Sequence, residues 1–161
     1  MFIRRKSAFD KPHDSVTRAR TEETKLALRE EETYKSFRQN VARVRSEIRR
    51  VITEARASNK SVYIYGASTK GNTILQFCEI DNTMVPKAAD RNPDKWGRRT
   101  LGTNVEIISE AQARAERPDY FLVMPWHFFD EFKEREREFL EGGGKFILPL
   151  PEVRIVGAEV L

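Results

Sequence analysis

The stretch Ser61-Val62-Tyr63-Ile64-Tyr65-Gly66-Ala67-Ser68-Thr69-Lys70-Gly71-Asn72 decides the fold class of this chain. Its first half is β-branched and aromatic, which is typical of a short buried strand. A turn between two glycines follows, and residues 71–80 then place apolar side chains at helical spacing. A strand that enters a helix through a tight turn predicts the first unit of a parallel α/β sheet.

The same alternation continues toward the C-terminus. We expect further strands over 85–89, 105–108, 120–124 and 145–150. We expect helices over 109–116, with Ser109 as the N-cap, and over 126–141. This pattern predicts an α/β, Rossmann-like domain: a five-stranded parallel sheet with flanking helices, in the order 3-2-1-4-5.

The N-terminal third has a different pattern. Residues 1–20 are polar and are expected to form a flexible tail. Residues 21–58 predict one long amphipathic helix, because apolar side chains recur at alternating steps of three and four: Tyr34, Phe37, Val41, Val44, Ile48, Val51 and Ala55. This stripe packs on the α/β body or forms a dimer seam, and we favour the first. The Rossmann-like domain would then occupy 59–156, followed by a tail over 157–161.

Composition narrows the class of protein. The 161 residues carry a net charge of +4, and the basic excess lies in residues 1–57, where acids interleave with it. We therefore expect no nucleic-acid partner. The single cysteine, Cys78, argues against a disulfide framework and a cysteine-based zinc site. No long apolar stretch and no secretory signal is present, so we expect no membrane partner and a cytoplasmic location.

Ligands of open parallel sheets bind beyond the carboxyl ends of the strands. The first such loop is a candidate phosphate site, because backbone N–H groups at a helix start face anions and a lysine adds charge. It matches neither the P-loop nor the dinucleotide fingerprint. The alternative is a turn that needs glycine for its geometry alone. The candidate residues are Gly66, Ala67, Ser68, Thr69, Lys70, Gly71 and Asn72.

Other candidates follow the second and fourth strands. Asp90 lies 24 residues after Gly66, where an acid accepts hydrogen bonds from ribose hydroxyls or simply forms a turn. Lys95, in the basic loop after it, is a candidate anion contact, and Trp126 completes the nucleotide-binding set. His127 is only a weak catalytic candidate, because no nucleophile or paired acid lies near it in the sequence.

Five strings occur together and in order: residues 63–72, 89–97, 118–123, 125–127 and 143–151. Over 21–156 the chain closely resembles the C-terminal domain of the sugar-nucleotide C-methyltransferases. In that family a zinc domain and a central S-adenosylmethionine domain, which holds the catalytic base, precede a Rossmann-like C-terminal domain. The resemblance implies a role in deoxysugar biosynthesis, with methylation of a carbon of a nucleoside-diphosphate deoxy-keto-sugar that is typically thymidine-linked.

The resemblance implies that this chain docks the nucleotide sugar through its 66–72 turn. The zinc cysteines and the S-adenosylmethionine domain have no counterpart here, so we expect binding without a cofactor and without methylation, alongside a separate methyltransferase subunit or domain. The family usually has Trp-Asn where this chain has Trp126-His127. We expect a monomer or a weak dimer. A free-standing NAD(P)-type oxidoreductase and a helix-mediated interaction module are the alternatives.

Overall fold

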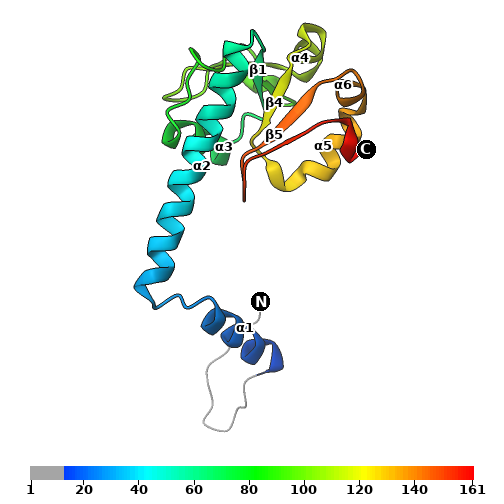
Figure 1. The fold of residues 1–161 in the computed structure, drawn as a ribbon. Coiled ribbons are helices and arrows are strands. Elements are labelled where there is room, and N and C mark those ends of the chain that lie inside the picture. The colour runs from blue at the N-terminus through cyan, green and yellow to red at the C-terminus, as the bar shows by residue number, and fades with distance from the viewer. Residues whose placement is uncertain (1–12) are drawn as a thin grey trace. The chain divides into compact units, whose positions relative to one another are not determined.

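A six-stranded sheet organises residues 42–161 of the computed structural model, which describes residues 13–161 (Figure 1). The strand order is β3-β2-β1-β4-β5-β6. The first five strands pair in parallel, whereas β6 pairs antiparallel with β5. The strands are β1 (Val62–Tyr65), β2 (Lys87–Asp90), β3 (Glu106–Ser109), β4 (Tyr120–Val123), β5 (Lys145–Leu148) and β6 (Arg154–Val156).

Helices cover both faces of this sheet, as Figure 1 shows. The C-terminal part of α2 and α3 lie on one face, and α4, α5 and α6 lie on the other. The helices are α1 (Asp14–Lys25), α2 (Glu31–Ala57), α3 (Thr69–Phe77), α4 (Glu110–Glu116), α5 (Phe129–Arg135) and α6 (Arg137–Glu141). Short 3-10 turns are η1 (Pro93–Lys95), η2 (Trp126–Phe128) and η3 (Ala158–Val160).

Because both faces are covered, strand side chains are buried in both directions. Ile64 of β1 packs in the core with Ile48 and Leu75 from α2 and α3. Its neighbour Tyr65 points to the opposite core, where it meets Phe132 of α5. The two cores explain why β1 and β4 are nearly continuous apolar runs in the sequence.

The predicted α/β class and the order 3-2-1-4-5 are confirmed, with two corrections. A sixth strand, β6, extends the sheet beyond the predicted five. The helix expected over 126–141 is divided into η2, α5 and α6, with a break at Glu136. Glu136 is 2% exposed and pairs with a side chain of α4, so a tertiary contact interrupts the helical pattern.

The helix expected over 21–58 is two helices, α1 and α2, with Ala27 between them at φ +49°. Of the predicted tail, residues 1–12 lie outside the described part of the chain, and 13–20 lie in α1 or its cap. At the other end, η3 lies within the tail predicted over 157–161.

The apolar stripe of α2 is buried toward its C-terminal end, where Val44, Ile48, Val51 and Ala55 join the core. Packing on the α/β body is therefore confirmed for these four side chains. Tyr34 and Phe37 are exposed, and a dimer seam involving them remains a prediction. No helix within residues 13–161 combines the length and apolarity needed to cross a membrane.

Candidate functional site

The turn after β1 owes its two glycines to close packing. Gly66 has φ +85°, and a Cβ added there would lie 2.6 Å from Cγ of Pro125. At Gly71 an added Cβ would lie 2.4 Å from Cβ of Met124. Both contacts are with the segment that follows β4. The glycine pattern is thus sufficiently explained by backbone geometry and by the packing of α3 on the sheet.

Two other polar residues of this turn serve the local structure. Ser68 is the N-cap of α3, and its Oγ accepts a hydrogen bond from the Gly71 N–H at 3.0 Å. The Asn72 amide donates to the Leu101 carbonyl at 3.0 Å and accepts from Thr103 at 3.2 Å. Through these contacts Ser68 stabilises the turn, and Asn72 stabilises the loop between β2 and β3.

Thr69 and Lys70, by contrast, are exposed in the first turn of α3. The first N–H groups of a helix have no partner inside the helix, and they carry a partial positive charge. The Lys70 side chain makes no ion pair with the residues that the structure describes. This end of α3 therefore offers an anion both backbone donors and an uncompensated ammonium group.

Asp90, at the end of β2, is tied to the turn after β1. Its Oδ2 accepts hydrogen bonds from the Ala67 N–H and the Lys95 ammonium, both at 2.9 Å. Its Oδ1 accepts from the Asn92 N–H at 2.9 Å, and the side chain is only 12% exposed. Asp90 and Lys95 thus hold the end of β2 against the turn after β1. A ribose contact of Asp90 and an anion contact of Lys95 remain predictions.

The remaining predicted residues lie in η2, directly after β4. Trp126 is half-buried, His127 is exposed, and their ring centroids are 5.5 Å apart in an edge-on arrangement. Neither residue lines the crevice of about 300 Å³ that lies at the carboxyl edge of the sheet. The structure brings the 66–72 turn, Asp90 and Lys95 together, and Pro125, directly before Trp126, packs on Gly66 of that turn.

A crevice of about 300 Å³ opens at the carboxyl edge of the sheet. It lies where β1 is flanked by β2 on one side and β4 on the other, which is the switch point of the strand order. Its lining was largely missed in the sequence, because most of it comes from α4, η2 and α5. The lining residues are Tyr65, Gly66, Asp90, Arg91, Glu110, Phe128, Glu131, Phe132 and Arg135.

A buried hydrogen-bond network lies below this crevice. The Tyr65 hydroxyl donates to Glu136 at 2.7 Å and accepts from Arg135 at 2.8 Å. Arg135 also pairs with Glu110 at 3.1 Å, and Arg114 donates to Glu136 at 2.9 Å. Burial, followed by the Glu136 charge, raises the pKa of Tyr65, so its hydroxyl stays protonated. The network fixes the polar side chains at the base of the crevice.

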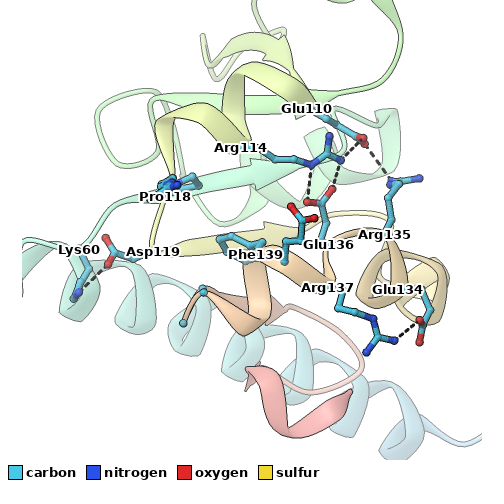
Figure 2. Close-up of a pocket in the computed structure, with 15 residues that line it drawn as sticks. Lys60, Glu110, Arg114, Pro118, Asp119, Glu134, Arg135, Glu136, Arg137 and Phe139 are labelled. Atoms are coloured by element: carbon cyan, nitrogen blue, oxygen red, sulfur yellow. Dashed lines mark hydrogen bonds and ion pairs between the residues drawn. The ribbon is translucent and has the colours of Figure 1, made fainter.

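A second and larger cavity, about 1160 Å³, runs between α4 and the α5–α6 segment. Figure 2 shows that most of its charged side chains bond to one another. Arg114 lies between Glu110 and Glu136, Arg137 pairs with Glu134 at 2.6 Å, and Lys60 pairs with Asp119 at 2.8 Å. The hydrogen bond to Glu136 is the main cause that raises the pKa of Arg114. This groove is polar, and most of its charges are compensated internally; Arg117 and Glu138 make no ion pair with the described residues.

The fold defines a Rossmann-like domain with a crevice at the switch point of its sheet. The chain belongs to the family described as the C-methyltransferase C-terminal domain, whose model matches residues 1–151. It is similar to the C-methyltransferase NovU of Streptomyces niveus, with 37% identity over 126 residues. That match covers 78% of this chain but only 30% of NovU.

Proposed function

We propose that this domain binds the nucleotide-sugar substrate of a C-methyltransferase at the carboxyl edge of its sheet. One observation carries the proposal: the exposed start of α3, with Lys70, adjoins the switch-point crevice through Gly66. A diphosphate needs fixed N–H donors and positive charge, and a nucleoside needs an adjoining cavity. Membership of the C-methyltransferase C-terminal domain family supports the same ligand class.

In this proposal some residues at the turn bind the ligand and others position the backbone. The N–H groups of Thr69 and Lys70 and the Lys70 ammonium hold the diphosphate. Asp90 and Lys95 are positioning residues, because their bonds to Ala67 fix the backbone that leads into α3. Lys95 donates to the Ala67 carbonyl at 3.0 Å, so both the backbone N–H and the backbone carbonyl of Ala67 are held. The site is preorganised before the ligand arrives.

S-adenosylmethionine has no phosphate group, so it lacks the group that the N–H donors of Thr69 and Lys70 and the Lys70 ammonium would hold. We therefore propose that another domain or subunit binds S-adenosylmethionine and transfers the methyl group. In that arrangement this domain presents the sugar and does not methylate it alone. We further propose a thymidine-linked sugar, a cytoplasmic setting and at most weak self-association.

Calorimetric titration of the full chain tests the proposed function. Thymidine diphosphate is expected to bind saturably with one site, and S-adenosylmethionine is expected to give no saturable heat. Inorganic pyrophosphate is expected to bind more weakly than thymidine diphosphate, because it lacks the nucleoside. Saturable binding of S-adenosylmethionine with none for the nucleotide would overturn the proposal.

A further inference from the structure

We infer that the switch-point crevice is a nucleobase subsite in which the base stacks on Phe128 beneath Arg91. This inference rests on the proposed function, since it adds the place of the base to a proposed diphosphate site. Both residues line the 300 Å³ crevice, one directly after β2 and the other directly after β4. A cavity of this size accommodates a nucleoside rather than a dinucleotide.

Phe128 is an exposed aromatic ring on a firm support. It is 46% exposed, whereas Phe132, one helical turn later, is 7% exposed. The ring centroids of Phe128 and Phe132 lie 6.3 Å apart in an edge-on arrangement. The ring centroids of Phe128 and His127 lie 4.4 Å apart. An aromatic face that remains open to water gains free energy when a flat base covers it.

Arg91 supplies the complementary cation. Within residues 13–161 its side chain makes no ion pair and no hydrogen bond, while Arg135 in the same crevice makes both. A guanidinium is planar and weakly hydrated, so it stacks readily on aromatic rings and bases. An arginine without an ion pair and an exposed phenylalanine that line one crevice are the two kinds of side chain expected in a base-binding slot.

The base of the crevice provides polar groups for the edge of the ring. Glu110, 13% exposed, and Arg135, 26% exposed, are joined at 3.1 Å and so present an acceptor beside a donor. Arg135 is held in turn by the Tyr65 hydroxyl. Base edges alternate donors and acceptors in the same way. Gly66 belongs to both the crevice and the turn, so a nucleoside here places its phosphates at α3.

The test compares thymidine diphosphate with inorganic pyrophosphate, both by calorimetry on the full chain. We expect Phe128→Ala to weaken thymidine diphosphate about tenfold or more, and to leave pyrophosphate affinity unchanged. Phe77→Ala is the matched control, because Phe77 is 48% exposed on α3 outside the crevice. It is expected to change neither affinity.

Phe128→Trp gives a second readout that loss of folding does not imitate. We expect it to retain nucleotide affinity and to show fluorescence quenching on addition of thymidine diphosphate but not of pyrophosphate. Unchanged nucleotide affinity in Phe128→Ala, or an equal loss for both ligands, overturns the base subsite. A wild-type chain that binds pyrophosphate but gains nothing from the nucleoside also overturns it. If the wild type binds neither ligand, the proposed function itself fails.

Discussion

The two cavities of this domain differ in the state of their charges. The groove between α4 and α5–α6 is about four times larger than the crevice, from volumes of 1160 and 300 Å³. Most of its charged side chains are bonded to one another, from Lys60–Asp119 to Arg114–Glu136, whereas Arg117 and Glu138 make no ion pair with the described residues. The crevice keeps Arg91 unpaired within the described residues and leaves the ring of Phe128 open.

For this reason the proposed ligand site is the crevice, although the groove is larger. Charges that already bond within the protein gain little from a ligand, because the ligand must first replace those bonds. An open aromatic face and an unpaired cation have no such competitor. The groove should therefore control stability, and the crevice with its adjoining turn should control affinity.

The largest expected effect is on stability, at the groove. Glu136→Ala leaves the Arg114 guanidinium without its main partner and removes an acceptor from the buried Tyr65 hydroxyl. We expect the free energy of unfolding, measured in urea, to fall by about 3 kcal/mol. Thymidine diphosphate affinity of the folded protein should change little.

Glu134→Ala is the control for that variant, because the Glu134–Arg137 pair is exposed at the rim of the same groove. It should cost less than about 1 kcal/mol. If Glu136→Ala weakened nucleotide binding strongly at unchanged stability, the assigned roles of the two cavities would be reversed.

The next effect concerns packing beside the crevice. Gly71→Ala places a methyl group against Cβ of Met124, so α3 or the end of β4 must move. We expect a loss of about 2 kcal/mol in the free energy of unfolding, the usual cost of overpacking. Thr73→Ala, on an exposed position of the same helix, should cause no loss. A fully stable Gly71→Ala protein would contradict the packing role of this glycine.

Lys70→Ala is expected to lower ligand affinity without changing the stability of the fold. Loss of one charged contact should weaken thymidine diphosphate about tenfold in Kd, and pyrophosphate by a similar factor. The melting temperature should barely change, because the side chain is exposed. Lys145→Ala, an exposed lysine at the start of β5, is the control. A large drop in melting temperature with unchanged Kd would make Lys70 a structural residue.

The smallest expected effect is a change of stability with pH, and it comes from Glu116, a carboxylate that is already paired with Lys87. Hydrogen bonds from Lys87, and then from Tyr63, lower the pKa of Glu116 from 4.5 to about 2. In the folded state the Glu116 carboxylate therefore stays ionised between pH 4.5 and about 2, where the same group in the unfolded state binds a proton. This contribution to stability is complete above pH 4.5 and is lost as the pH falls toward 2.

Urea unfolding between pH 5 and pH 3 measures this loss. Lys87→Met removes the main donor, so its stability should depend less on pH over that interval than the stability of the wild type. Arg91 is not among the groups that lower the pKa of Glu116, so Arg91→Met should keep the wild-type slope. Equal slopes for Lys87→Met and the wild type would contradict the assignment of Glu116.

The architecture was largely predictable because it follows from local pattern. The apolar runs of β1 and β4 and the Ser109 cap of α4 are visible in the sequence, and the structure confirms them. β6 was missed, since three residues beyond a proline pair carry no periodicity of their own. The break at Glu136 depends on Arg114, 22 residues earlier, which no local pattern contains.

The sequence predicted which loops form the candidate site, but not which contacts their residues make. The rule for parallel sheets pointed to the turn after β1 and to the end of β2, and the structure brings these together. The sequence does not show that Lys95 and the Ala67 N–H engage the Asp90 carboxylate. Phe128 fits the apolar face of an amphipathic helix, so only the tertiary structure reveals its open ring.

The two outer edges of the sheet have a consequence for how copies of this chain meet. Beside β3, the loop backbone bonds to Ile107, through the Gly97 N–H and the Arg98 carbonyl at 2.8 Å each. Beside β5 lies β6, a three-residue strand that begins with an exposed arginine. Open strand edges recruit other chains, whereas covered, short or charged edges resist it. We therefore expect that neighbouring molecules do not join their sheets into a continuous ribbon, even at high concentration.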